Sequence, residues 1–579
     1  MRSIAFLLFV AMLLVYGCRT NNAGNSIRVR LALEPDKLNP LLTIQEQSTQ
    51  ICSKMFLSLM DYSPKTLQMV PVLAVSAPTQ TKVDTGEMAG TTAWNYEIRP
   101  EAVWDNNKPV TAEDYVFSVK AIVNPNVSNG QIKSYVEHIK DIKVDAANPK
   151  KFTVYTRTYM LAENSCSSIP IMPAYAYDSA QLLRNIPLSQ FCSSDTNVIK
   201  ALAADPRVIK FAELFQSPDF TSNPKKITGC GPYKIVEWNR EQRIVLRKKS
   251  KWWGDALASV NPILAAVPAQ LEYLIVKDAS TAINMLKGGQ LDLVSKIPPA
   301  IFDELRNNDS TKTTLQYVTA PTPALAYIGI NCARPTLSDV KVRRALAHLN
   351  NIQSIVADVM KGYAEPITGP FHPTKPYNNK ALTPIEFSLE KATALLAESG
   401  WKDTDADGTL DKNIGGKKVP LKLTYLVASV SEPGKNIGLL LKENAAKVGI
   451  NIEIQAVEGS LLMERLKKRD FDLYSLTFGQ DLADDDPKQI WHTSSNTPTG
   501  GNRFGFGNAA SDALIEKIRV TLDPAERAPL YIQFQQILYD AQPCIFLFTP
   551  KDRYIASTRF QMEATFKRPG YAESTFVVK

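Results

Sequence analysis

Between residues 421 and 478, apolar strands alternate with amphipathic helices, and this pattern limits the possible folds more than any other feature of the sequence. Strands are predicted over 421–427, over 450–454, where apolar and polar residues alternate strictly, and over 471–478. Helical spacing of apolar residues joins each strand to the next. Strands connected in this way form right-handed crossovers in a mainly parallel sheet. The C-terminal half is therefore predicted to be α/β.

The N-terminal half has a different pattern, in which long polar loops separate short strands. Alternating strands are predicted over three segments, 94–98, 151–155 and 243–247. Thr111 is predicted to cap the clearest helix of this half, Ala112–Val123. Near the C-terminus, the continuous apolar run 544–548 suits a buried strand, which we expect to return the chain to the first domain. In the second half, a helix is predicted over 338–362, capped by the serine at its start.

Residues 1–17 have the composition of an export signal. One cation precedes thirteen apolar residues, 4–16, and a helix needs about twenty residues to cross a bilayer. The sequence VYGC at 15–18 is similar to a bacterial lipobox, so Cys18 is predicted to carry lipid as the first residue of the mature protein. The tyrosine in this motif stands where a small residue is usual, and a plain secretory peptide with an incidental cysteine is the alternative. We therefore expect a signal peptide over 1–17 and a polar, lipidated tether over 18–26.

Charge and composition exclude several classes of protein. The net charge of +8 comes from 66 basic and 58 acidic residues among 579, which is a small excess on a mixed surface. A nucleic-acid partner is therefore not predicted. With 44% hydrophobic and 21% charged residues, the chain has the composition of an ordinary soluble globular protein. Collagen-like, wholly disordered and multi-span membrane proteins are excluded.

The sequence contains no local motif of a metal or nucleophilic enzyme. None of the four histidines is spaced as HExxH, and GxSxG, P-loop and SxxK motifs are absent. Six cysteines remain after Cys18, none of them spaced as CxxC; buried free thiols are favoured, and the sequence does not choose among possible disulfide pairings. The segment 403–408 matches the first half of a calcium loop, but Ile414 occupies the position of the bidentate glutamate, so a tight acidic turn is favoured over a calcium site. No cofactor, no metal and no enzymatic activity are predicted.

An acidic segment, 478–487, follows the third predicted strand. In open α/β sheets, ligands bind in the crevice beyond the carboxyl ends of the strands. Asp481 stands three residues past the apolar end of its strand and can point into that crevice. The aspartates at 484–486 are predicted to be solvated and to cap a helix after Pro487. From position alone, a binding role for Asp481 and a mere acid in a loop are equally open.

Several motifs stand in one order along nearly the whole mature chain, from about residue 31 to 550. They are LEPDKLNPL at 33–41, WDNNKPVTAEDYVF at 104–117, TGCGPY at 228–233, KGGQLD at 287–292 and LSDVKVRRAL at 337–346. Together they resemble the solute-binding proteins of peptide ABC importers, the oligopeptide- and dipeptide-binding family (extracellular solute-binding family 5). The chain departs from the family pattern in the first motif, which has Asn-Pro where Asp-Pro is usual, and at Asn350-Asn351, where an acidic-basic pair is common.

The resemblance implies a fold of two lobes with a deep cleft that closes on ligand by hinge motion. This is the α/β periplasmic-binding-protein fold, type II and similar to the large cluster C, with an extra subdomain in lobe I. The implied boundaries are 27–67, 227–331 and 545–579 for lobe I, 68–226 for the extra subdomain and 332–544 for lobe II.

The resemblance also implies a binding site. In this family, peptides bind in extended form between the lobes, through backbone hydrogen bonds like an added strand. An aspartate of lobe II holds the α-ammonium of the peptide, and Asp481 matches it. The residues expected beside the peptide are Phe478, Gly479 and Gln480 on lobe II, and Glu46 and Gln47 on lobe I. Asn502 and Arg503 are candidates near the peptide carboxylate, with Arg503 as its cation.

The implied function is that of an exported, periplasmic lipoprotein that binds short peptides as a monomer and delivers them to an inner-membrane ABC permease. Other cargoes on the same fold remain open: a metal chelate, haem or an oligosaccharide. Asp481 favours a peptide as cargo, because the α-ammonium of a peptide requires an acidic partner in the site. Two alternatives come from other classes of protein: an exported peptide hydrolase and a sensory peptide receptor. The absence of a local nucleophile or metal motif argues against the hydrolase.

Overall fold

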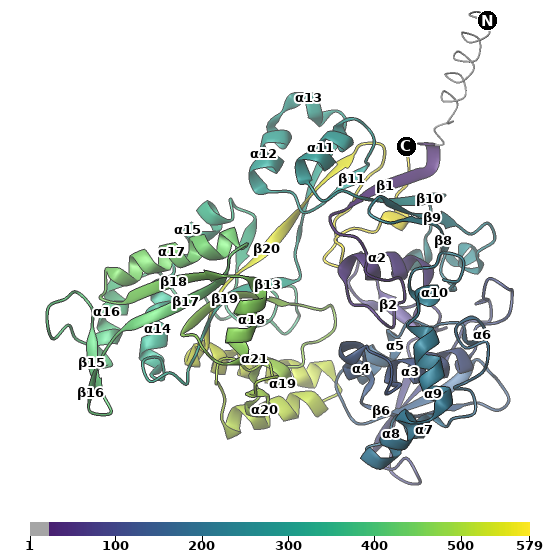
Figure 1. Cartoon of the computed structure of the whole chain (residues 1–579), viewed down its shortest axis with the longest axis horizontal. Coiled ribbons are helices and arrows are strands. Elements are labelled where there is room, and N and C mark those ends of the chain that lie inside the picture. Colours follow the sequence, from purple (N-terminus) through teal and green to yellow (C-terminus); the bar gives the residue numbers. More distant parts are fainter. Residues whose placement is uncertain (1–22) are drawn as a thin grey trace, which may run out of the picture.

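One 12-stranded sheet runs through two lobes (Figure 1). The computed structural model describes residues 23–579. Along the sheet the strands lie in the order β18 (Asn451–Val457), β17 (Lys422–Ala428), β19 (Leu473–Gly479), β13 (Ala324–Ile330), β20 (Cys544–Ser557), β11 (Leu293–Val294), β1 (Ser26–Leu31), β10 (Gln270–Ile275), β9 (Arg243–Lys248) and β8 (Tyr233–Asn239). Two further strands pair with β20, namely β12 (Leu315–Pro321) and β14 (Ala364–Pro366). The last strand of the sequence therefore belongs to the sheets of both lobes.

Lobe II is the α/β domain predicted from the alternation of strands and helices. Its strand β17 is parallel to β18 and β19, whereas β13 is antiparallel to both β19 and β20. Apolar side chains fill both faces of this part of the sheet. One face is covered by α14 (Val340–His348), α16 (Leu389–Glu398) and α17 (Glu432–Ala446). The other is covered by α18 (Gly459–Lys467), α20 (Ala509–Val520) and α21 (Pro524–Ala541).

Lobe I carries a second, separate sheet within its extra subdomain. This antiparallel sheet has the order β4 (Thr79–Val83), β5 (Thr91–Glu97), β7 (Lys151–Thr156) and β6 (Ile139–Val144). The main helices of the lobe are α2 (Glu46–Met55), α3 (Ala112–Val123), α4 (Gly130–Val136), α5 (Ala162–Ser167), α8 (Thr196–Ala203), α9 (Pro206–Phe215), α11 (Ala279–Lys287) and α12 (Pro299–Asn307). Thr111 caps α3, as the sequence predicts, and the structure adds a capping box with Asp114. A single apolar core joins the subdomain to the rest of the lobe.

The chain crosses between the lobes twice. The first crossing is the turn between β12 and β13, at residues 322–323. The second lies within β20, because residues 544–548 pair with β13 whereas residues 551–557 pair with β12. The first crossing lies before the boundary expected at 331/332, because β13 belongs to the lobe II sheet. The second lies a few residues after the boundary expected at 544/545, because the start of β20 also belongs to that sheet. An apolar strand can belong to the sheet of either lobe, so its sequence does not reveal to which lobe it belongs.

The helix expected over 338–362 is wrong in its length. It ends with α14 at His348, and its cap is Asp339, whose carboxylate accepts a hydrogen bond from Lys341 N at 2.9 Å. Asn350 Nδ2 donates to the carbonyl of Leu346 at 2.9 Å, and Asn351 Oδ1 accepts from Ser354 N at 3.1 Å. These side chains compete with the helical hydrogen bonds and break the helix.

The described part of the chain shows the state of the cysteines and whether a helix could span a membrane. The six cysteines there are free thiols, and Cys52, Cys166, Cys230 and Cys544 are buried. Within residues 23–579 the structure has no helix both long and apolar enough to span a bilayer.

Candidate ligand-binding site at the lobe crossing

The carboxyl end of β19 lies beside the first crossing between the lobes. Gly479 is opposite Ala324 in the ladder with β13, and Gln480 N donates to the carbonyl of Pro323 at 2.9 Å. On its other edge, β19 pairs with β17 only through Leu473 and Tyr474. Beyond them, in the part of the chain that the structure describes, this edge has no strand partner. An extended chain could therefore add to it.

The acidic run after β19 is paired with cations and is not the solvated run expected from the sequence. Each carboxylate has its own cation: Arg527 for Asp484, Lys375 for Asp485 at 3.7 Å and Arg519 for Asp486 at 2.9 Å. Tyr377 also donates its hydroxyl to Asp485 at 2.8 Å. Burial raises the pKa of Asp485 to about 6, and Lys375 opposes that rise. The cations come from segments far away in sequence, so no local pattern predicts them.

Asp481 differs from the other three aspartates because its carboxylate is exposed. Among the described residues, none forms a hydrogen bond or an ion pair with this carboxylate. The backbone around it is held firmly nevertheless. Lys375 Nζ donates to the carbonyl oxygens of Asp481 at 2.6 Å and Leu482 at 3.3 Å, and to that of Ala483. A fixed loop thus presents one negative charge that has no cation of its own.

Two tyrosines of lobe I lie near this charge. They are Tyr62 in β2 (Met60–Tyr62) and Tyr135 in α4. Burial raises the pKa of both hydroxyls, and the charge of Asp481 raises both further. Tyr62 also accepts a hydrogen bond from Asn164 Nδ2 at 2.6 Å. Sequence analysis missed these tyrosines, because nothing in the sequence links their segments to Asp481.

Glu46 connects lobe I to the same crossing. Its carboxylate lies 2.8 Å from Lys296 Nζ and 3.8 Å from the guanidinium of Arg568. Arg568 in turn donates to the carbonyl of Pro323 at 3.2 Å, the oxygen that also accepts from Gln480 N. The structure thus brings Glu46 close to the segment 478–481. Gln47, by contrast, is buried within its own lobe.

The structure does not bring Asn502 and Arg503 together with Asp481. Cys332 N donates to the carbonyl of Phe504 at 2.8 Å, which places the 502–504 loop just past the end of β13 that lies away from Ala324. The side chain of Asn502 is fully buried, and its Nδ2 donates to the carbonyl of Phe506 at 2.8 Å. Asn502 therefore stabilises its own loop, and among the described residues no hydrogen bond or ion pair joins Arg503 to Asp481.

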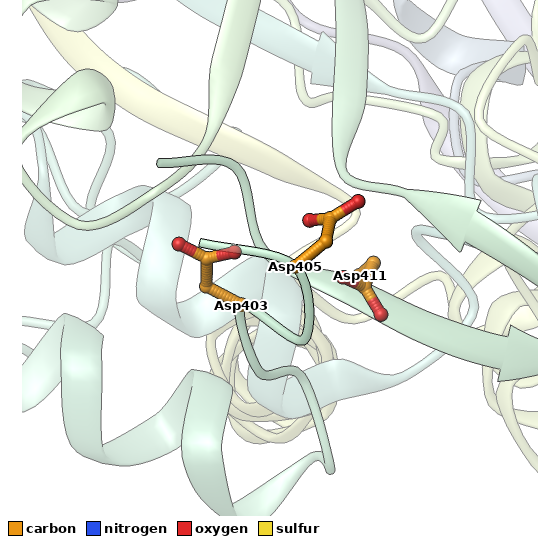
Figure 2. A group of neighbouring side chains, drawn as sticks. All are labelled: Asp403, Asp405 and Asp411. Atoms are coloured by element: carbon orange, nitrogen blue, oxygen red, sulfur yellow. The ribbon is translucent and has the colours of Figure 1, made fainter. Parts of the chain in front are cut away.

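A second acidic group lies at the far side of lobe II. Asp403 and Asp405 lie in one turn and Asp411 begins β15 (Asp411–Ile414), as Figure 2 shows. One carboxylate oxygen of each lies within 4.8 Å of the others. Lys418 Nζ lies 2.6 Å from Asp405 and 3.2 Å from Asp411. Thr404 also donates its hydroxyl to Asp411 at 2.8 Å. One lysine thus forms ion pairs with two of the three carboxylates.

Comparison with known proteins gives a family and a set of similar folds. Residues 68–501 match the family described as "Bacterial extracellular solute-binding proteins, family 5 Middle". The oligopeptide-binding protein AppA of Bacillus subtilis is 26% identical over 532 residues, which are 91% of this chain and 87% of AppA. The structure of AppA in complex with a nonapeptide superimposes with a TM-score of 0.68 at 24% identity, covering 96% of this chain and 99% of that one. NikZ of Campylobacter jejuni in complex with Ni(L-His) has a TM-score of 0.68 at 21% identity and covers 93% and 95%.

Proposed function

The chain belongs to family 5 of the bacterial extracellular solute-binding proteins, and from this membership we propose that it binds short peptides between its lobes and delivers them to the permease of an ABC importer. The family and the two-lobe α/β fold expected from the sequence are confirmed. AppA, whose name and structure both refer to peptides, supports a peptide as the cargo. The observation that carries the proposal is the exposed carboxylate of Asp481 beside the open edge of β19.

The chemistry of this loop favours an amine. Asp484, Asp485 and Asp486 are already paired with cations, so a ligand ammonium would find its free partner in Asp481. A carboxylate facing an ammonium makes a charge-assisted hydrogen bond, which is about twice as strong as a neutral one. The backbone of Phe478 and Gly479 would then pair with the extended peptide, with Glu46 on the opposite lobe.

A metal chelate is the second candidate, because NikZ has the same fold and its structure contains Ni(L-His). A nickel ligand near Asp481 would most simply be a histidine. His372 is the histidine that contacts this loop, but its Nδ1 lies 2.8 Å from Thr374 Oγ1 and its Nε2 lies 2.9 Å from Thr549 Oγ1. Both ring nitrogens are therefore engaged, which favours the peptide.

A four-way cycle tests the role of Asp481. A peptide bound between the lobes would shield Asp481 from water, and truncating one partner of such a buried charge pair typically costs about 2–5 kcal/mol. Asp481→Asn should therefore weaken binding of a free-amine peptide by roughly thirty-fold or more. Acetylating the peptide should weaken its binding to the wild type by a similar factor. Because the two groups are in contact, the combined loss should be smaller than the sum. Calorimetry measures all four affinities.

The control is Glu526→Gln, which removes one exposed negative charge elsewhere in lobe II and should leave affinity unchanged. If the losses add, or if the acetylated peptide binds as tightly as the free one, Asp481 is only an acid in a loop. Mass spectrometry of the same samples would reveal cleaved peptide if the protein were a hydrolase.

The lipid anchor is part of the proposal. Cys18 lies outside the described residues, and the anchor rests on the apolar segment 4–16 and the adjoining Gly17-Cys18. A lipid at Cys18 would hold the protein at a bacterial membrane, facing the periplasm, within reach of a permease.

A further inference from the structure

The loop 157–161, between β7 and α5, leaves the extra subdomain and contacts lobe II. Met160 N donates to the carbonyl of Arg519 in α20 at 2.8 Å. The Met160 side chain is only 8% exposed, and it belongs to the apolar cluster of lobe II rather than to that of its own lobe. The hydroxyl of Tyr531 in α21 lies 3.5 Å from its sulfur. Met160 of lobe I thus contacts two helices of lobe II, with its backbone at α20 and its side chain at α21.

Tyr159 makes the polar half of this contact. Its hydroxyl donates to Asp486 Oδ2 at 2.9 Å, and the guanidinium of Arg519 bonds to the same carboxylate oxygen at 2.9 Å. That guanidinium also lies 5.3 Å from the centre of the Tyr159 ring, a cation–π distance. The buried ring of His138, whose centre is 5.4 Å from that of Tyr159, supports the tyrosine from its own lobe.

This contact is separate from the two crossings of the chain. The crossings lie at 322–323 and within β20, whereas this contact joins the loop before α5 to α20 and α21, which lie below β20 in Figure 1. The lobes are therefore joined covalently at the two crossings and by noncovalent contacts at Tyr159 and Met160. Every atom in the contact belongs to the protein, so it needs no peptide to form.

We propose that Tyr159 and Met160 form a clasp that holds the lobes closed with or without ligand and so limits the rate at which a ligand enters and leaves. When the lobes part, the Met160 side chain must leave its apolar surroundings and the Tyr159–Asp486 hydrogen bond must break. A clasp made equally in the free and the loaded closed states stabilises both, so it changes the exchange rates more than the affinity. The part of this proposal that concerns peptides rests on the proposed function.

Small-angle scattering on the peptide-free protein tests the clasp directly. Met160→Ser should shift the population toward open molecules and increase the radius of gyration, whereas Met160→Leu, which keeps the apolar contact, should scatter like the wild type. Tyr159→Phe removes only the hydroxyl and should give a smaller shift in the same direction. Met463→Ser alters an exposed methionine of α18 and should have no effect. Thermal unfolding of each variant verifies that it is folded.

Stopped-flow mixing with a fluorescent peptide provides the second readout. Met160→Ser should speed both association and dissociation about tenfold, with a much smaller change in their ratio. A residue that merely stabilised its loop would not speed association. Unchanged scattering together with unchanged rates in Met160→Ser would overturn the clasp. Because the scattering uses no ligand, it decides the clasp even if the cycle at Asp481 rejects the peptide function, and the reverse also holds.

Discussion

Lys375 is the side chain on which the shape of the loop at Asp481 depends. It is almost fully buried, and it donates to three successive carbonyls, beginning with that of Asp481. Lys375→Met should therefore release the loop and weaken binding of a free-amine peptide by roughly tenfold or more, as expected when a binding group is misplaced. Titration calorimetry measures the change.

The direction of that change separates two roles of the lysine. If Lys375 acted only through its positive charge, its removal would strengthen the attraction of Asp481 for an ammonium and tighten binding. Tighter binding by Lys375→Met would thus contradict a positioning role. The matched control is Lys380→Met, which removes an exposed lysine from the same segment and should change nothing.

At the scale of residues, the sequence predicts the acid but not its surroundings. Asp481 could be singled out because it follows a strand of an α/β sheet, where ligands bind. Lys375, Tyr62 and Tyr159 could not, because they approach the loop from segments about 100–420 residues away and carry no motif. Arg503, proposed from the family resemblance as the cation for the peptide carboxylate, remains a prediction.

Among the elements, Asp292 ties three strands of lobe I together. Its carboxylate is 1% exposed and lies 2.9 Å from Arg28 Nε of β1 and 3.1 Å from Arg559 Nε, just past β20. It directly precedes β11. Asp292→Asn should lower the free energy of unfolding by about 3 kcal/mol, because both guanidiniums lose a buried partner.

Denaturation in urea measures this loss, with Asp309→Asn as the control. Asp309 forms an exposed ion pair with Lys312, one turn away on the same short helix, and such pairs contribute little to stability. If the urea midpoint of Asp292→Asn were as unchanged as that of Asp309→Asn, the carboxylate of Asp292 would not hold the strands together.

Elements with a strong local pattern were predicted well, and elements decided by side-chain hydrogen bonds were not. The strands β17, β18 and β19 appear where apolar alternation or runs predict them, and α3 begins at its predicted cap. The helix after Asp339 is shorter than its apolar spacing suggests, because asparagine side chains replace its backbone hydrogen bonds. Periodicity reports burial and says nothing about such competition.

For the whole molecule, the anchor at Cys18 can be tested by fractionation. Cys18→Ala should move the protein from the membrane to the soluble fraction, or leave it unprocessed at a higher mass, because the residue that accepts the lipid is gone. Mass spectrometry and membrane flotation distinguish these outcomes from the wild type. Cys332→Ala, at a half-buried thiol, should not alter fractionation. Unchanged membrane attachment and unchanged mass in Cys18→Ala would remove the lipoprotein from the proposal.

The place of β20 also sets the order in which the chain can fold. This strand is synthesised among the last residues, yet it lies between β13 and β11 in the middle of the sheet. Near its end, Arg559 donates to the carbonyl of Ser26 across 533 residues of sequence. Contacts of such long range form slowly, because the intervening chain must first be brought together. A chain exported through a narrow channel must remain unfolded until it has passed. Because the strand that completes both lobes is synthesised late, the sheet of a chain exported as proposed above would stay incomplete until nearly the entire polypeptide had crossed.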